Sequence, residues 1–160
     1  MVRPPVELRL DVEALYAEYA RLIDDGPLSQ WGELFAEDAV YKVLTRENVE
    51  RGWPLALILC ENRAAIEDRI TAVDQLMMTV PRAVRHLMSG FRIEPAGEGA
   101  WAVRANFAVF ETIAAQMTKV YAAGLYDDVV VRAPDDRLRF ARKISICDGD
   151  VIPNSLVLPL

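Results

Sequence analysis

The sequence predicts an α+β fold, because apolar residues recur at helical spacing in the first half of the chain and at alternate positions in the second half. Helices followed by a run of strands indicate helices packed on one face of a curved, mostly antiparallel sheet. The 160 residues are 52% apolar and 26% charged, which is typical of a globular protein. We therefore expect one domain, 1–160, whose folding buries roughly 70% of the unfolded surface.

Three helices are expected in the first half. The first spans about 6–24, where an apolar stripe is followed by a Gly-Pro break. The second, about 27–35, is short, and Pro27 suits the first turn of a helix. The third, about 62–78, begins with the capping residue Asn62 and ends before the next proline.

Six strands are expected from their β-branched and aromatic residues and from the turn residues between them. They span about 39–45, 55–59, 83–94, 99–112, 117–131 and 137–148. The stretch 48–54 reads as a turn. The segment 149–160 is apolar for a free tail, so we expect it to dock on this chain or on a neighbour.

Alternation predicts which side chains share a face of the sheet. In strand 83–94 it places Leu87 and Ile93 on one face and His86 with Arg92 on the other. In the last strand the alternating apolar residues are Leu138, Phe140, Ile144 and Ile146.

Composition excludes several classes of protein. The net charge of −6 argues against a nucleic-acid partner, since such proteins concentrate basic charge. No segment reaches the roughly 18 uninterrupted apolar residues of a membrane span. The first residues lack the apolar core of a signal peptide, so a cytoplasmic location is expected.

The metal-binding residues are too few for a catalytic iron or zinc site. His86 is the only histidine, and Cys60 and Cys147 stand far apart, which indicates two buried thiols rather than a disulfide. A Rieske cluster needs two histidines and two cysteines. We expect this chain alone to carry no such metal.

Two polar clusters lie between apolar runs, one within 41–48 and one within 81–87. Arginine favours fixed, bidentate contacts at interfaces, so these clusters suggest docking surfaces. The helical pair Asp68-Arg69 is read as a further candidate, against the alternative of a solvated helix face. The candidate interface residues are Arg46, Glu47, Asn48, Asp68, Arg69, Arg85 and His86.

The order of the expected elements is that of the cone-shaped, cystatin-like fold shared by nuclear transport factor 2 and ketosteroid isomerase. Within that group the chain resembles the small (β) subunit of aromatic-ring-hydroxylating dioxygenases, and the salicylate- and benzoate-type branch most of all. The stretches that carry the resemblance are Leu22-Ile23-Asp24-Asp25-Gly26, Trp31, Leu34-Phe35, Tyr41, Arg46-Glu47-Asn48, Gly52-Trp53-Pro54-Leu55-Ala56, Asp68-Arg69, Arg85-His86-Leu87, Asp148 and Ile152-Pro153-Asn154-Ser155-Leu156.

The resemblance implies a partner. In that family three small subunits assemble with three large (α) subunits. The large subunit holds a Rieske [2Fe–2S] cluster and a mononuclear non-haem iron, and electrons arrive from NAD(P)H through a reductase. The small subunit holds no cofactor and is mainly structural.

Two other functions stay open from the residues alone. The first is a free-standing isomerase-like or dehydratase-like enzyme with an acid/base pair in the cone, for which the candidates are Asp24, Asp38, Tyr41 and His86. The second is a dimeric small-molecule-binding module. For His86, a hydrogen-bonded structural or interface role is favoured over catalysis.

Overall fold

The computed structural model describes residues 4–76, 81–149, 156 and 158–160. Its helices are α1 (Val6–Asp24), the 3₁₀ helix η1 (Leu28–Leu34), α2 (Arg46–Glu50) and α3 (Arg63–Leu76). Its strands are β1 (Phe35–Thr45), β2 (Ile58–Cys60), β3 (Arg82–Gly97), β4 (Ala100–Ile113), β5 (Lys119–Arg132) and β6 (Leu138–Cys147).

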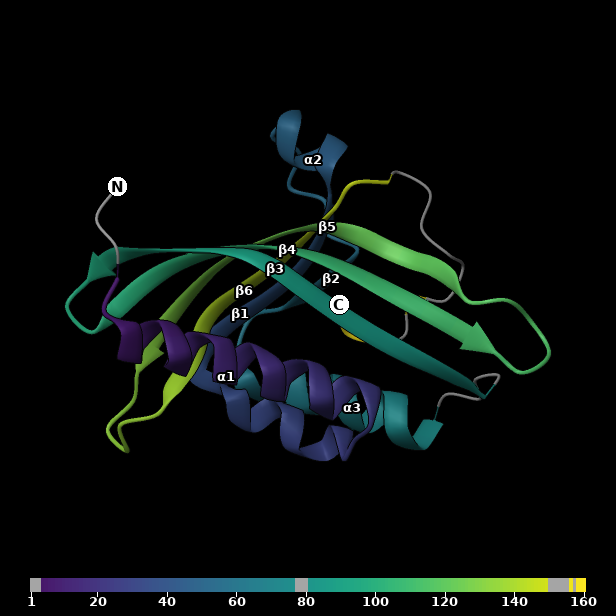
Figure 1. The fold of residues 1–160 in the computed structure, drawn as a ribbon, viewed down its shortest axis with the longest axis horizontal. Helices are drawn as coiled ribbons and strands as arrows, with labels where there is room; N and C mark the ends of the chain where they lie inside the picture. Colours follow the sequence, from purple (N-terminus) through teal and green to yellow (C-terminus); the bar gives the residue numbers. More distant parts are fainter. Residues whose placement is uncertain (1–3, 77–80, 150–155, 157) are drawn as a thin grey trace.

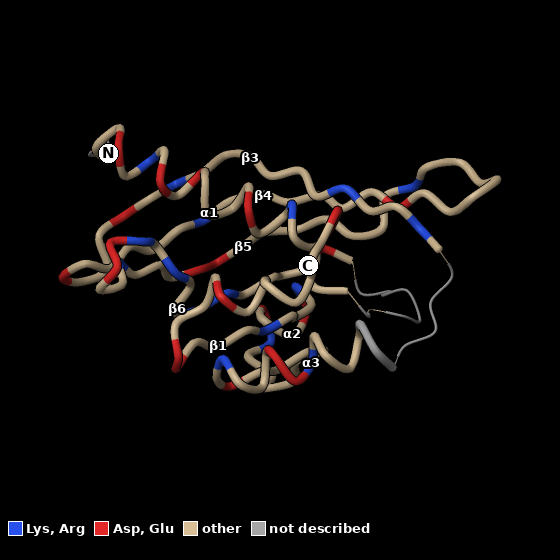
Figure 2. The backbone as a smooth tube through the Cα atoms, turned by 90° about the horizontal axis from the view of Figure 1, so that it is seen from below, with Lys and Arg blue, Asp and Glu red and all other residues tan. Residues whose placement is uncertain are grey.

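In the described part of the chain the six strands form one sheet in the order β2-β1-β6-β5-β4-β3. Neighbouring strands run antiparallel except β1 and β6, which are parallel. The sheet is curved, and α1 and α3 lie on the same side of it (Figure 1). Helix α1 packs on β3 and α3 on β1, so the two helices cover opposite halves of the sheet (Figure 2). This arrangement confirms the predicted α+β fold.

Several boundaries differ from those expected from the sequence. β1 begins at Phe35 rather than at residue 39, and the second strand is 58–60 rather than 55–59. The expected turn at 48–54 begins instead with α2. The Thr45 hydroxyl accepts the Asn48 N–H at 3.2 Å, which caps this short helix.

Aromatic side chains fill the space between the helices and the sheet. Trp31 of η1 is fully buried and packs edge-on against Phe35 and Tyr41 of β1. The largest fully buried aromatic side chains are Trp31, Tyr16, Tyr19, Tyr41, Tyr126, Phe35 and Phe140. The tyrosine hydroxyls bring polar atoms into this core, and each needs a partner there.

Several β-bulges interrupt the ladders of the described sheet, and two of them overturn the faces expected from regular alternation. The first lies in β3 between Ser89 and Arg92, where Gly90 adopts a φ of +69°. A one-residue slip moves every later side chain to the other face, so alternation cannot be extended through it. His86 therefore lies on the core side together with Ile93, and Leu87 is 57% exposed. The predicted faces of this strand are wrong for that reason.

The second bulge lies where β5 meets β6, between the pairs Val129–Arg142 and Val130–Phe140. Past it the buried residues of β6 are Lys143, Ser145 and Cys147. The regular alternation expected for this strand would have placed Ile144 and Ile146 on that face instead.

The expected docking tail, 149–160, lies largely outside the described residues. Of its described members, Leu156 and Leu158 pack against the core and Leu160 is buried within it. Arg69 Nη2 of α3 donates a hydrogen bond to the Leu156 carbonyl at 3.2 Å. In both backbone views the described C-terminal residues lie close to the centre of the molecule (Figures 1 and 2).

Candidate functional site

Asp24 and His86 form a buried pair beneath the first bulge. Asp24 is the last residue of α1, and its carboxylate accepts the backbone N–H of His86 at 2.8 Å. The ring Nδ1 lies 2.6 Å from the other carboxylate oxygen. The side chains are 6% and 1% exposed, respectively. A carboxylate is disfavoured at a helix C-terminus, and the two histidine donors offset that cost.

The pair has a defined hydrogen-bond polarity. An ionised carboxylate can only accept, so Nδ1 carries the proton and Nε2 of a neutral ring presents a lone pair. Among the described residues the buried Nε2 finds no hydrogen-bond partner. The arrangement orients an imidazole as a proton acceptor, which is the geometry of a general base held by a carboxylate.

The other two residues of the acid/base hypothesis do not join this pair in any described contact. Asp38 of β1 is exposed. Tyr41 is fully buried, and its hydroxyl accepts the backbone N–H of Leu160 at 3.0 Å. Burial raises the pKa of the Tyr41 hydroxyl, so at neutral pH it stays protonated.

Asp128 of β5 and Lys143 of β6 form a second buried polar group, which the sequence did not single out. Both side chains are fully buried, and Lys143 Nζ lies 3.1 Å from Asp128 Oδ2. The carboxylate also accepts the Tyr16 hydroxyl and, at 2.8 Å, the Ile144 N–H. Lys143 Nζ lies 2.9 Å from the centroid of the Tyr126 ring, so an aromatic face stabilises the cation as well.

Burial shifts the ionisation of this group. Desolvation lowers the pKa of Lys143 to about 8, while the Asp128 charge partly opposes that change. Desolvation raises the pKa of Asp128, against the opposing effects of Lys143 and Tyr16. The pKa of the Tyr16 hydroxyl is raised by burial first and by the Asp128 carboxylate second. Removing one partner of an ion pair in these surroundings should strongly lower the free energy of unfolding, because the other charge stays buried without a partner.

The signal for this group was present in the sequence but was masked by the bulge. Asp128 and Lys143 each lie in a strand rich in apolar residues, directly after another charged residue, Asp127 and Arg142 respectively, and charged residues are seldom fully buried. Regular alternation would have put Lys143 on the outer face, with solvent as its partner. Only the slip at residue 141 turns it inward.

The first polar cluster lies on α2, which projects from the sheet on the side away from α1 and α3 (Figure 1). Arg46 forms an ion pair with Asp148, and both side chains are about half exposed. Glu47 pairs with Arg51 at 2.9 Å, and the Asn48 amide donates to the Leu55 carbonyl at 2.8 Å. These three residues shape the α2 projection, and two of the three present charge to solvent.

The remaining interface candidates lie apart from α2. Asp68 is exposed on α3, and its neighbour Arg69 is turned toward the tail. Arg85 forms an exposed ion pair with Asp25 at 2.7 Å. The structure therefore places Arg85 at the surface of the isolated chain and His86 in its interior.

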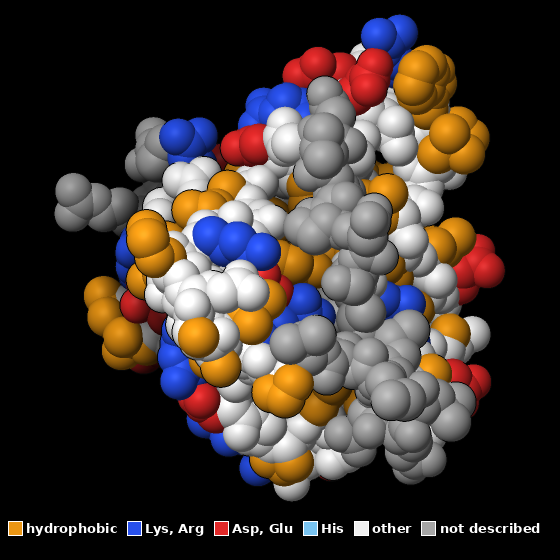
Figure 3. All heavy atoms as spheres, turned by 90° about the vertical axis from the view of Figure 1, so that its right-hand side faces the viewer, with side chains coloured by type: hydrophobic (Ala, Val, Ile, Leu, Met, Phe, Trp, Pro, Cys, Tyr) orange, Lys and Arg blue, Asp and Glu red, His pale blue; other side chains and the backbone are white. Residues whose placement is uncertain are grey.

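Exposed apolar side chains gather beside the α2 projection. Figure 3 shows hydrophobic side chains next to charged ones at the top of this view, where α2 lies. We call this group the α2–β2 strip; its members are Val49, Trp53, Leu55, Leu57 and Leu59. Each is at least 44% exposed, although a globular surface seldom leaves several large apolar residues together.

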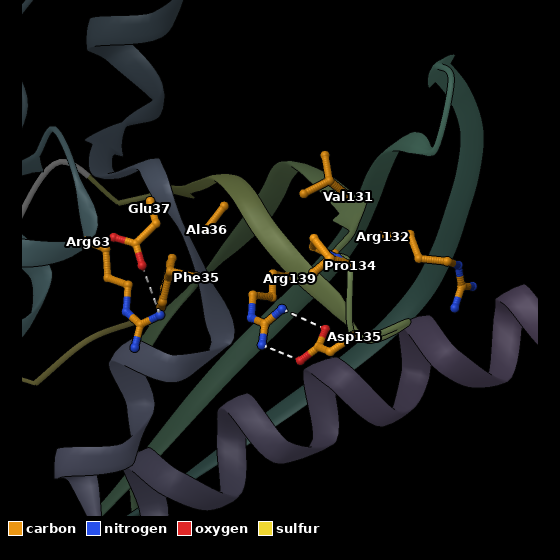
Figure 4. Close-up of a pocket in the computed structure, with 10 residues that line it drawn as sticks. Phe35, Ala36, Glu37, Arg63, Val131, Arg132, Pro134, Asp135 and Arg139 are labelled. Carbon is orange, nitrogen blue, oxygen red and sulfur yellow. Dashed lines mark hydrogen bonds and ion pairs between the residues drawn. The ribbon is translucent and has the colours of Figure 1, made fainter.

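A hollow of about 510 Å³ lies elsewhere, between the start of β1 and the turn that joins β5 to β6. Figure 4 shows Arg139 engaged by Asp135 and Arg63 by Glu37, while Arg132 points away. Because its guanidinium groups are already paired, this hollow offers little uncompensated charge to an anion. Neither it nor a second hollow of about 310 Å³ near Gly90 is lined by Asp24 or His86.

The described residues contain no cluster of three His, Cys, Asp or Glu side chains that could hold a metal ion. The single histidine is engaged by Asp24, and both cysteines are buried. Burial raises the pKa of the Cys147 thiol to about 11, so it is not a ready thiolate ligand. The residues of this chain do not fit a Rieske cluster, which needs two imidazoles.

Comparison with known proteins identifies the family. Residues 4–143 match the SnoaL-like domain family. The chain is 30% identical over 150 residues to the anthranilate 1,2-dioxygenase small subunit of Burkholderia cepacia, covering 94% of this chain and 92% of that protein. The chain belongs to the small subunits of aromatic-ring dioxygenases. It is also 25% identical to the terephthalate 1,2-dioxygenase terminal oxygenase subunit beta 1 of a Comamonas species, covering 94% of this chain and 97% of that protein.

Solved structures agree with this assignment. The small subunit superposes with a TM-score of 0.87 on a Novosphingobium aromaticivorans chain assigned as the beta subunit of an aromatic-ring-hydroxylating dioxygenase, with 28% identity over 96% of this chain and 97% of that one. The beta subunit of the Burkholderia mallei benzoate 1,2-dioxygenase shares the fold, with a TM-score of 0.75 and 20% identity over 97% and 98% of the two chains. The resemblance stated from sequence motifs is confirmed. No helix among the described residues is long and apolar enough to cross a membrane.

Proposed function

We propose that this small subunit is the non-catalytic, structural component of a cytoplasmic aromatic-ring dioxygenase. It assembles as a homotrimer with three large subunits. The large subunit supplies the Rieske [2Fe–2S] cluster, the mononuclear iron and the aromatic-binding pocket, and electrons come from NAD(P)H through a reductase. The substrate class proposed is a carboxylated aromatic compound. The observation that carries the proposal is near-full-length similarity to a small subunit, over 94% of this chain.

The described surface supports a docking role. The α2–β2 strip combines five exposed apolar side chains with the charged residues of α2, among them Arg46 and Glu47. Protein interfaces concentrate binding energy in aromatic and arginine anchors surrounded by polar residues. We assign this strip as the contact with the large subunit, with Trp53 as its anchor. Asn48 supports it by holding the Leu55 carbonyl.

Arg69 and Asp68 of α3 and Arg85 of β3 are proposed as secondary interface residues. Arg85 is exposed and lies beside Leu87, which is also exposed on the same edge strand. A long edge strand invites pairing with another chain. This edge is therefore the proposed contact between neighbouring small subunits, with His86 supporting it from inside the sheet.

The first experiment is a tagged pull-down of this chain from native lysate, with the mass and iron content of the co-purifying chains determined. The proposal expects a larger iron–sulfur chain at one-to-one stoichiometry. A lone, colourless dimer would contradict it.

The second experiment tests the strip. Trp53→Ser combined with Leu55→Ser should lower recovery of the large subunit at least tenfold, while the isolated variant unfolds like the parent. The matched control is Met117→Ser, which removes an apolar side chain that is 89% exposed in the turn between β4 and β5. Equal loss in the control, or no loss in the strip variant, would remove the strip from the interface.

A second candidate function rests on one observation, the buried Asp24–His86 pair with its unpartnered Nε2. That geometry favours proton-transfer chemistry within the chain. His86→Gln separates the two functions. If the variant lowers recovery of the large subunit while the dioxygenase that still assembles keeps its turnover, the pair is structural. If the isolated chain isomerises or dehydrates a small carbonyl compound and the variant does not, the enzyme function replaces the structural one.

A further inference from the structure

Leu160 is held in the core by a set of hydroxyl groups from three separate elements. Its backbone N–H donates to the Tyr41 hydroxyl at 3.0 Å. Its carbonyl oxygen accepts from the Tyr19 hydroxyl at 2.5 Å and from the Ser145 hydroxyl at 2.7 Å. These partners come from α1, β1 and β6, and Leu160 is 1% exposed.

This receiving site pairs the Leu160 backbone with side-chain hydroxyls rather than with other backbone groups. Tyr19, Tyr41 and Ser145 are all fully buried, so any hydroxyl that lost Leu160 would lose a partner away from water. The backbone N–H and carbonyl of a buried leucine must be paired in any case, but regular secondary structure would pair them with other backbone groups. The site instead presents two converging donors and one acceptor at fixed positions, which is the pattern of a specific binding site.

The walls of the site are aromatic. The Trp31 ring centroid lies 5.3 Å from those of both Tyr19 and Tyr41. Lys143 Nζ lies 4.8 Å from the centroid of the Tyr19 ring, so a buried amine contacts the ring whose hydroxyl donates to Leu160. The site thus joins apolar walls to a few convergent polar groups, as small-molecule sites do.

The spacing of the polar groups defines the ligand class. In Leu160 the N–H and the carbonyl are attached to the same carbon atom, which also carries a branched apolar side chain. The matching chemistry is a carbonyl or carboxyl group with an N–H or O–H donor on the adjacent carbon. Acylated apolar amino acids and 2-hydroxy acids of similar size have this arrangement.

We propose that the residues that receive Leu160 form a ligand-binding cavity that the segment 158–160 fills from within the chain, and that this cavity accepts an acylated apolar amino acid or a 2-hydroxy acid when the segment is withdrawn. Leu156 is held separately by Arg69, so withdrawal of residues 158–160 leaves that contact in place. The cavity is tested on the isolated chain, so its test is separate from that of the proposed function.

The first test uses a variant that lacks residues 158–160. N-acetyl-L-leucinamide is the neutral probe, and N-acetyl-D-leucinamide is the stereochemical control. Calorimetric titration of the folded variant should show saturable one-site binding of the L probe, at least tenfold tighter than the D probe and than either probe with the full chain. Tyr41→Phe in the same background should weaken binding several-fold because the N–H acceptor is lost. A folded variant that does not bind the L probe would overturn the proposal.

Replacing the probe distinguishes the two ligand classes. N-acetyl-L-leucine and 2-hydroxy-4-methylpentanoate differ in carrying N–H or O–H next to the carboxyl group. Binding of only the first assigns the cavity to acylated amino acids, and binding of both assigns it to the wider class.

The second test uses the full chain and serves if the variant that lacks residues 158–160 does not fold. In the full chain with ¹⁵N-labelled leucine, the Leu160 amide signal reports whether the segment is seated. The proposal expects saturable displacement of that signal by the L probe but not by the D probe. An unchanged Leu160 signal at saturating probe concentration would overturn it.

Discussion

The interior of the sheet and the α2 projection use polar groups in opposite ways. Inside, Lys143 and Asp128 are fully dehydrated, and their charges are met by each other and by tyrosines. On α2, the Arg46–Asp148 pair is about half exposed, and it stands beside apolar side chains that have no cover in the isolated chain. Polar residues are buried where apolar ones are expected, and apolar residues are exposed where polar ones are expected.

The difference indicates that the interior serves the stability of the chain and that the α2–β2 strip serves contact with a partner. The interior is filled by side chains of the chain itself, Leu160 among them, and its opposite charges lie against each other. The α2–β2 strip leaves aromatic and leucine side chains exposed to water, and burying them in an interface would be favourable. A packed core combined with an exposed apolar surface is what a structural subunit would have.

Breaking the buried ion pair should have the largest effect. Lys143→Met leaves Asp128 charged and buried, and we expect it to lower the free energy of unfolding by about 3–5 kcal/mol. Asp128→Asn should cost a similar amount. The double variant should lose much less than the sum of the two, because neither charge is then left unpaired. Urea unfolding measures all three, and additive losses would show that the charges do not depend on each other.

Removing the Asp24 charge should have the next largest effect. In Asp24→Asn the side-chain oxygen can still accept the His86 N–H, but the ring loses its ionic acceptor. We expect a loss of about 1–3 kcal/mol, which is the cost of leaving a buried polar group poorly paired. Before the substitution, ¹⁵N spectra of the imidazole should show the proton on Nδ1. A proton on Nε2 instead would contradict the described hydrogen bond.

Alkaline pH should increase the stability supplied by the interior. The folded-state pKa of Lys143, about 8, lies below its ordinary 10.5, so the unfolded chain binds more protons between these values. The free energy of unfolding should therefore rise with pH from about 8, by at most about 1.4 kcal/mol per pH unit. The rise is opposed above about pH 9. There the buried Cys147 thiol, whose folded-state pKa is about 11, and then the buried tyrosines keep protons that the unfolded chain releases, so their contribution lowers the free energy of unfolding as the pH rises.

The control for this pH dependence is the Asp128→Asn, Lys143→Met double variant. It keeps the other titrating groups and lacks the buried lysine. If its unfolding free energy rises with pH as steeply as that of the parent, Lys143 is not the cause.

The smallest effect is expected on α2. Arg46→Ala removes an exposed ion pair, and such pairs contribute little to stability because solvent and salt screen them. Thermal unfolding of the isolated chain should not change measurably, at low or high salt. Recovery of the large subunit in the pull-down should nevertheless fall. If the variant unfolds at a lower temperature but assembles normally, α2 contributes to stability rather than to assembly, and the proposed division of roles is wrong.

Regular patterns made most of the fold predictable. The apolar stripe of 6–24 and the alternation of β4 gave elements close to those observed, since neither contains an irregularity. The faces of β3 and β6 could not be read in the same way. Gly90 and the slip at Ala141 each add one residue to a strand, and nothing in the local pattern marks the added residue.

The candidate site was predicted in part. Asp24 and His86 were named together because both residue types serve in proton transfer, but their contact joins residues 62 positions apart. Asp38 and Tyr41 were named on the same grounds, and the structure places one in solvent and the other against Leu160. Asp128 and Lys143 were missed as a pair because the burial of Lys143 depends on the second bulge.

The sequence by itself determined the fold class, the absence of enough histidine and cysteine for a Rieske cluster, and the resemblance to the dioxygenase small subunits. These follow from periodicity, residue counts and ordered motifs, which are local or additive properties of the chain. Only the tertiary structure decided that His86 and Lys143 point inward and that Leu160 occupies a hydroxyl-lined site in the core. Those outcomes depend on strand register and on contacts between distant segments, and one extra residue in a strand is enough to reverse them.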